Sequence, residues 1–84
     1  MKQLFSDQAW DDYLHWQRMD RKLLERINGL IEEACRHPFK GRGKPEPLRN
    51  ALSGYWSRRI TEEHRFVYRV VDSSLWIVQL RYHY

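Results

Sequence analysis

The sequence has almost no cysteine and no long apolar run. Cys35 is the single cysteine among 84 residues, so no internal disulfide can form and nothing indicates an oxidising compartment. Its neighbours Ile31 and Ala34 favour a buried helical position over a reactive thiol. No apolar segment approaches membrane-spanning length, and Asp7 and the acidic pair that follows it are unlike a signal peptide. We therefore expect a cytoplasmic protein with no membrane partner.

Several chemical motifs are also lacking. His15, His37, His64 and His83 show no close paired spacing, and there is no Cys-x-x-Cys pair, so we expect no metal site. The glycines near position 42 lack the spacing and the following helix of a phosphate-binding P-loop. No Gly-x-Ser-x-Gly element is present. We expect no cofactor, and any catalysis should be metal-free acid–base chemistry by Glu, His, Arg and Tyr.

Charge is distributed unevenly along a chain whose length suits one domain, residues 1–84. Residues 1–37 hold six Lys/Arg against seven Asp/Glu, whereas residues 38–84 hold nine against four, a balance of +5. The basic half is also rich in aromatic residues. Basic groups neutralise phosphates and aromatic rings stack on bases, so nucleic acid is the leading partner. The alternative is a solvated basic face with no partner.

The first half predicts two helices. Lys2–Phe5 can form a short strand, and Ser6 or Asp7 can cap a helix over about residues 7–18. Asp20 can cap a second helix with a continuous apolar stripe, which ends before Pro38. A DNA-reading helix-turn-helix does not suit the charge balance of this half. We expect both helices to pack on a sheet.

The second half predicts three strands over residues 55–60, 64–71 and 75–84. Short connections favour an antiparallel meander, so the fold class is α+β, with two N-terminal helices on a twisted antiparallel sheet. Phe66, Tyr68 and Val70 should face the helices. The opposite face, which includes Arg65 and Arg69, should be polar and basic.

Two segments carry candidate acid–base groups. Pro45 and Pro47 fix the backbone on both sides of Glu46, in an otherwise cationic loop. Glu46 is either a presented carboxylate or a solvated counter-charge for nearby lysines. If the last strand continues to Tyr84, Arg81 and His83 share one face. His83 is then either a proton-transfer group or part of the polar face of an edge strand.

Several segments together resemble the Txe/YoeB toxins of bacterial toxin–antitoxin modules. The resemblance extends over essentially the whole chain without a change of length. The segments that carry it are residues 44–48 (KPEPL), 52–65 (LSGYWSRRITEEHR), 67–68 (VY), 81–84 (RYHY) and 10–13 (WDDY) with Trp16. The resemblance implies the RelE-like, microbial-ribonuclease-like fold of helices on a twisted antiparallel sheet.

The resemblance also implies a function: an endoribonuclease that cleaves messenger RNA in the A site of the 70S ribosome. It implies a cognate antitoxin of the YefM/Axe type that wraps the toxin, operator DNA binding only through that complex, and a homodimer. The family's catalytic residues fall on Glu46, Arg65, His83 and Tyr84. Arg59 matches a basic RNA-contacting position, and Arg49 stands where lysine is common in relatives, which puts the geometry of that contact in doubt. The expected RNA- and ribosome-binding residues are Lys44, Arg49, Arg58, Arg59 and Arg81.

This chemistry is reasonable for RNA, which carries its own nucleophile. The 2′-hydroxyl attacks the adjacent phosphorus once a base such as Glu46 removes its proton. His83 can protonate the leaving oxygen, while Arg65 stabilises the charge of the transition state. One alternative is a non-catalytic protein that blocks the A site by occupancy. Another is an interaction module for an acidic, disordered partner.

Overall fold

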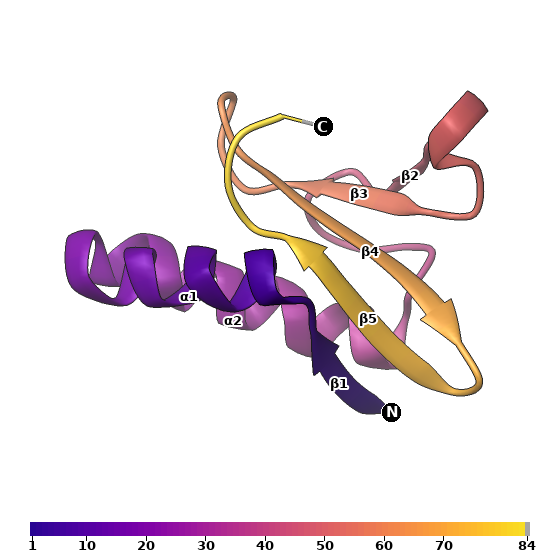
Figure 1. The fold of residues 1–84 in the computed structure, drawn as a ribbon, viewed down its shortest axis with the longest axis horizontal. Helices are drawn as coiled ribbons and strands as arrows, with labels where there is room; N and C mark the ends of the chain where they lie inside the picture. The colour runs from indigo at the N-terminus through magenta and orange to yellow at the C-terminus, as the bar shows by residue number, and fades with distance from the viewer. Residues whose placement is uncertain (84) are drawn as a thin grey trace.

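The computed structural model describes residues 1–83 and shows two helices packed on one face of a five-stranded sheet (Figure 1). The strands lie in the order β1-β5-β4-β3-β2. The elements along the chain are β1 (Lys2–Phe5), α1 (Asp7–Met19), α2 (Arg21–Arg36), β2 (Glu46–Pro47), the 3-10 helix η1 (Asn50–Leu52), β3 (Trp56–Arg59), β4 (Arg65–Val71) and β5 (Ser74–Gln79). The expected α+β fold class is confirmed.

Both helices begin at the predicted caps. The Ser6 hydroxyl accepts a hydrogen bond from the Ala9 amide at 3.0 Å, and the Asp20 carboxylate accepts one from the Leu23 amide at 3.0 Å. One face of α2 supplies much of the core, and its buried residues are Leu24, Ile27, Leu30, Ile31 and Ala34. The helix ends at Arg36, before Pro38. Neither helix in the described part of the chain is long and apolar enough to cross a membrane.

The sheet is mixed rather than wholly antiparallel. β2, β3, β4 and β5 form the expected antiparallel pairs, but β1 pairs parallel with β5, in a register that places Lys2 opposite Ser74 and Phe5 opposite Ile77. The two helices between β1 and the rest of the sheet allow this, because a parallel neighbour needs a long crossover. The Ser6 amide extends the pairing by donating to the Ile77 carbonyl at 2.9 Å.

The two faces of the sheet differ as strand alternation requires. Phe66, Tyr68, Leu75 and Ile77 are fully buried on the face that packs against the helices. The outer face is basic where Arg59 and Arg65 pair across β3 and β4. Further along β4 and β5 it carries Val71, Trp76 and Val78 beside Arg69, so the face expected to be polar and basic is partly apolar.

The last strand ends earlier than expected, at Gln79. The amide of Leu80 donates to the buried carboxylate of Asp12 at 3.0 Å, and the Trp16 indole donates to the Leu80 carbonyl at 2.8 Å. These side chains replace ladder partners, and Tyr82 then takes a positive φ of 63°. The strand alternation expected for Arg81 and His83 is therefore wrong. Tyr84 lies outside the described residues.

Candidate active site

A small recess on the outer face of the sheet brings together four of the expected functional residues. Lys44, Glu46, Arg59 and Arg65 line it together with Ser57, around a volume of about 50 Å³. Sites for small molecules are typically about 300–1,000 Å³. The recess can therefore hold only a group such as part of a phosphate, and the rest of any substrate must lie across the surface.

The backbone around Glu46 is set by pairing with β3. Glu46 lies opposite Ser57 in the antiparallel register, and the Leu48 amide donates to the Tyr55 carbonyl at 2.9 Å. The short strand β2 was not predicted. Pro47 is compatible with it because β2 lies at the edge of the sheet, where a proline without an amide hydrogen is tolerated. Glu46 itself is exposed. The strand pairing places its side chain on the outer face of the sheet, beside Arg59 and Arg65.

Arg58 does not lie at the surface, so its expected contact with RNA does not fit this structure. Its side chain is fully buried, and the guanidinium donates to the carbonyls of His37, Lys40 and Arg42 at 2.6, 2.8 and 3.1 Å. It also donates to the Tyr68 hydroxyl at 3.1 Å. Arg58 is the anchor of the loop that precedes Glu46.

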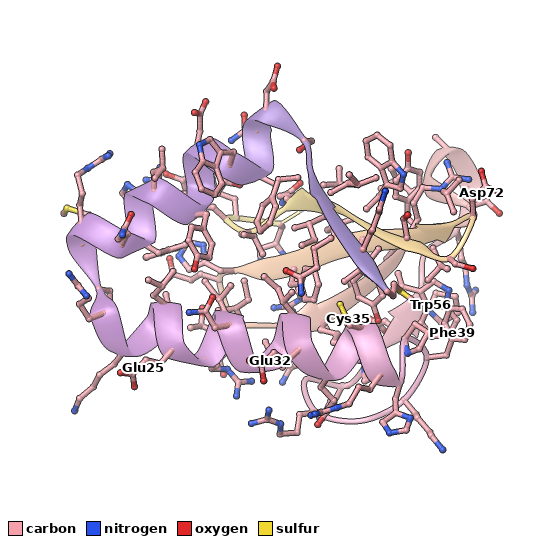
Figure 2. The ribbon with its side chains drawn as sticks, turned by 90° about the horizontal axis from the view of Figure 1, so that it is seen from below. Glu25, Glu32, Cys35, Phe39, Trp56 and Asp72 are labelled. Atoms are coloured by element: carbon pink, nitrogen blue, oxygen red, sulfur yellow. The ribbon has the colours of Figure 1, made fainter. Side chains whose placement is uncertain are left out.

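The same loop is held by a carboxylate and by aromatic packing. Glu33 of α2 accepts hydrogen bonds from the backbone amide of Arg42 and, at 3.1 Å, from the guanidinium of Arg58. The backbone hydrogen bond is the main cause that lowers the pKa of Glu33 below its ordinary value. Phe39 lies against Trp56 at a ring distance of 4.7 Å, beyond the C-terminal end of α2 (Figure 2).

Gly41 and Gly43 are required where the loop closes on this anchor. Gly41 has a φ of 115°, and a side chain there would meet the Glu33 carboxylate. Gly43 has a φ of 81°, and its carbonyl accepts from the Arg59 amide at 2.6 Å. Both values lie in the left-handed region that favours glycine. The loop therefore reaches the recess in one defined path.

Arg65 connects the recess to the C-terminal tail, residues 80–83. Its side chain lines the recess, and its Nη1 atom donates to the Thr61 carbonyl at 2.7 Å. Its backbone amide donates to the Tyr82 carbonyl at 3.0 Å. The strand that presents the cationic group therefore also binds the segment that carries His83.

Three further contacts fix the tail. The Gln79 amide nitrogen lies 2.8, 3.1 and 2.9 Å from the carbonyls of Arg81, Tyr82 and His83, which share its two hydrogens. The Tyr82 amide donates to Nδ1 of His64 at 2.8 Å. His83 is exposed and lines a separate, open depression with Gln79 and Tyr82. The structure thus brings Glu46 and Arg65 together and places His83 nearby rather than in the same recess.

His64 is held as a neutral acceptor. Its ring packs edge-on against Trp16 at 4.8 Å and lies 5.5 Å from the Tyr82 ring. Burial against these neighbours is the main cause that lowers the pKa of His64, and the positive charge of Arg81 adds to it. A neutral imidazole can accept at Nδ1, as the hydrogen bond from Tyr82 requires.

The remaining expected basic residues lie around the same region. Arg49 is exposed and lines an open surface depression with Glu46. The guanidinium of Arg81 lies 4.6 Å from the Tyr82 ring, and its Nε atom has no acceptor among residues 1–83. Within that range no group of three His, Cys, Asp or Glu side chains is arranged to hold a metal ion.

Sequence reasoning did not assign a role to four residues that position the tail: Asp12, Trp16, His64 and Gln79. Asp12 offered a signal, because it is a carboxylate on the buried face of α1, between Ala9 and Trp16. A buried acidic residue needs a donor, and Leu80 supplies one. His64 and Gln79 gave no such signal, because their partners are backbone groups of a non-repetitive segment.

Over almost its whole length, the chain is similar in sequence to known proteins. The family model described as YoeB-like toxin of bacterial type II toxin–antitoxin system matches residues 5–84. The chain is 58% identical to Toxin YoeB of Escherichia coli (strain K12) over 84 residues, which is 100% of both proteins.

Solved structures are similarly close. A YoeB/ParE toxin from Agrobacterium tumefaciens superposes with a TM-score of 0.97 at 56% identity, and the match covers 100% of both chains. The toxin chain of a heterotetrameric YoeB-YefM complex from Staphylococcus aureus gives 0.91 at 44% identity, covering 100% of this chain and 98% of that one. A YoeB dimer from the same organism gives 0.92 at 44% identity, with the same coverage.

A more distant likeness concerns the fold alone. The toxin–antitoxin complex RelBE2 from Mycobacterium tuberculosis matches with a TM-score of 0.73 at 21% identity, over 98% of this chain and 96% of that one. The expected RelE-like fold is thereby confirmed.

Proposed function

This chain belongs to the YoeB-like toxins of bacterial type II toxin–antitoxin systems, and from that premise we propose that it is a ribosome-dependent endoribonuclease that cleaves messenger RNA in the A site. The observation that carries the proposal is the recess in which the carboxylate of Glu46 lies with the cationic side chains of Arg59 and Arg65. A base with cations around a space that admits part of a phosphate is what cleavage by a 2′-hydroxyl needs.

The reaction begins with Glu46. Its carboxylate accepts the proton of the RNA 2′-hydroxyl, whose oxygen then attacks the adjacent phosphorus. A new bond forms between the 2′-oxygen and phosphorus, and the bond from phosphorus to the 5′-oxygen breaks. The products are a cyclic phosphate and a free 5′-hydroxyl. No metal ion is required for this sequence of steps.

Arg65 stabilises the negative charge that develops on the phosphoryl oxygens. Within its guanidinium, the hydrogen bonds to residues 1–83 are made by Nη1, which donates to carbonyls of residues 61, 62 and 64. Those carbonyls orient the guanidinium before substrate arrives, so little reorganisation is needed during the reaction. Arg59 lies opposite Arg65 across the strand pair and adds a second charge.

His83 donates the proton that the leaving 5′-oxygen requires. It lies one residue beyond Tyr82, which is bonded through its carbonyl to the Arg65 amide. The tail contacts of His64 and Gln79 hold this segment close to the recess. Tyr84 is assigned to the same catalytic group by the family resemblance and would orient the phosphate or stack on a base.

The ribosome supplies what the small recess lacks. Flexible RNA must be ordered into an in-line geometry, and the ribosome already holds the A-site codon, so the toxin needs only to complete the catalytic group. Lys44, Arg49, Arg59 and Arg81 would contact ribosomal and messenger phosphates. Arg58 is left out of this set because it is buried.

The partners follow from relatives. YoeB from Staphylococcus aureus forms a heterotetramer with YefM and also a dimer. We propose a cognate YefM/Axe-like antitoxin for this chain, operator DNA binding through that complex only, a homodimer, and action in the cytoplasm.

The alternative function is a non-catalytic protein that blocks the A site. It would use the same basic residues but would not need Glu46 or His83. The arrangement of a carboxylate between cations favours the enzyme, because a protein that only binds phosphates gains nothing from that negative charge.

Cell-free translation with mapping of messenger 5′ ends distinguishes the two functions. The wild type should produce discrete breaks within A-site codons, and Glu46→Ala and His83→Ala should each lose about 10²–10⁴-fold in cleavage while still binding the ribosome. Stalled ribosomes on intact messenger, with all three proteins alike, would establish the blocking function instead.

A further inference from the structure

A second groove lies on the outer face of the sheet, beside the recess. It has a volume of about 340 Å³ and is lined by Tyr55, Arg69, Val71, Trp76 and Val78. Arg69 and Trp76 are direct partners across β4 and β5, so their side chains share this face. Arg69 is four residues along β4 from Arg65, which places the two side chains on the same face, about 13 Å apart.

The groove presents a positive charge without a counter-ion. The guanidinium of Arg69 lies 5.0 Å from the centre of the Tyr55 ring, and its Nε atom is shielded from solvent with no acceptor among residues 1–83. Within the same part of the chain, the ion pairs involve Glu33 with Arg42 and Arg58, and none involves Arg69. Because Arg69 lines the groove and has no counter-ion there, its guanidinium can bind an anionic group in the groove.

The groove also presents an aromatic surface. Trp76 is 40% exposed, although its sheet neighbours Leu75 and Ile77 are fully buried. Aromatic rings beside unpaired cations are the combination that binds single-stranded nucleic acid, because every base has a face that can stack. The volume of the groove, unlike that of the recess, lies in the range of sites for a small molecule.

We propose that this groove is a subsite for a nucleotide of single-stranded RNA that flanks the cleaved bond, with its base stacked on Trp76 and its phosphate at Arg69. The inference rests on the proposed function, because it extends the RNA path from the recess along β4. Stacking does not depend on which base is present, so the subsite adds affinity and orientation rather than codon preference. An acidic peptide could also provide a counter-ion for Arg69, but it would not account for the exposed indole of Trp76.

Binding of fluorescein-labelled oligoribonucleotides tests the proposal. All proteins carry Glu46→Gln, so that the RNA stays intact, and the probes are oligouridylates of about twelve nucleotides and of about two, the latter too short to span the roughly 13 Å between Arg65 and Arg69. Trp76→Ala should weaken binding of the longer probe roughly tenfold and leave the shorter one unchanged. Trp76→Phe should retain most of the affinity. Trp10→Ala, which removes an exposed tryptophan of α1 instead, is the matched control and should bind both probes like the parent.

Abasic nucleotides identify the contact. Removing the flanking bases from the longer probe should weaken binding by the parent, and it should have no further effect on Trp76→Ala. Three results would overturn the subsite: an equal loss of RNA affinity in Trp76→Ala and Trp10→Ala, a loss of affinity for both probe lengths, or no RNA binding by the parent. The subsite would also be overturned if Trp76→Ala weakened binding of an acidic glutamate–leucine peptide but not of RNA.

The cleavage assay with Glu46 intact is read separately. If Trp76→Ala cleaves codons as well as the wild type, the subsite is overturned and the proposed function stands. If RNA binding depends on Trp76 but the wild type never cleaves, the subsite stands and the proposed function is overturned.

Discussion

The backbone amide of Tyr82 donates a hydrogen bond to Nδ1 of His64 at 2.8 Å, and this contact joins the C-terminal tail to the start of β4. The neighbouring residue Arg65 also binds the tail, since its amide donates to the Tyr82 carbonyl at 3.0 Å. The position of His83 therefore depends on an imidazole that must be unprotonated at Nδ1.

Tail docking should depend on pH through His64. The folded-state pKa of His64 is lowered, mainly by burial, so the unfolded chain takes up a proton near pH 6.5 more readily than the folded one. The contribution to stability is present above pH 6.5 and is lost as the pH falls below it. Urea unfolding measured on both sides of that pH should show the loss.

His64→Gln is the matched variant for this prediction. The glutamine amide oxygen can accept the Tyr82 hydrogen bond but does not titrate, so this part of the pH dependence should disappear. His64→Ala should be destabilised by about 1 kcal/mol above pH 6.5. An unchanged pH dependence in His64→Gln would assign the effect to another group.

Arg58→Met should destabilise the fold strongly. The variant leaves the carbonyls of His37, Lys40 and Arg42 without this donor and removes one of the two cationic partners of the partly exposed Glu33. We expect a loss of about 3 kcal/mol in the free energy of unfolding, measured in urea. Arg59→Met, the exposed neighbour on β3, should change stability by less than about 0.5 kcal/mol. Equal stability of the two variants would contradict the anchoring role of Arg58.

Trp16→Phe should loosen the tail while the core stays packed. The phenylalanine ring fills most of the same space but cannot donate to the Leu80 carbonyl, a hydrogen bond worth about 1 kcal/mol. Trimming by carboxypeptidase should become faster, and cleavage in the translation assay should fall more than ribosome binding. Trp10→Phe provides the control, because Trp10 is 48% exposed on α1. Resistance to trimming equal to that of the wild type would show that Asp12 alone holds Leu80.

Binding to ribosomes should weaken with salt because it depends on phosphate contacts. Lys44→Gln and Arg59→Gln should each reduce the slope of log affinity against log salt by about 1. Arg21→Gln, at the exposed start of α2, should leave the slope unchanged. Ribosome affinity that does not respond to ionic strength would exclude the proposed phosphate contacts.

The sequence predicted the helices well because their signals are local. The caps at Ser6 and Asp20 and the apolar stripe of α2 lie within a few residues of the structure they specify. The antiparallel meander of β3, β4 and β5 follows from short connections. The parallel pairing of β1 with β5 could not be predicted in the same way, because the partners are separated by almost the whole chain.

The residues of the candidate site also differ in how well the sequence predicted them. Glu46, Arg65 and Arg59 were recognised from their motifs, and the structure brings them together around one recess. Arg58 shares that motif and the same charge, yet strand alternation turns it into the interior, where Tyr68 and three loop carbonyls bind it. A charged residue next to another charged residue on a strand must face the other side of the sheet.

By itself, the sequence determined the fold class, the family and the chemical types at the site, because these depend on residue identity and short spacing. Only the tertiary structure decided where the last strand ends and how the tail that carries His83 is held. Asp12, Trp16 and His64 bind the backbone of residues 80 and 82 from distant parts of the chain. Backbone groups are the same at every position, so the sequence cannot show which of them a distant side chain will bind.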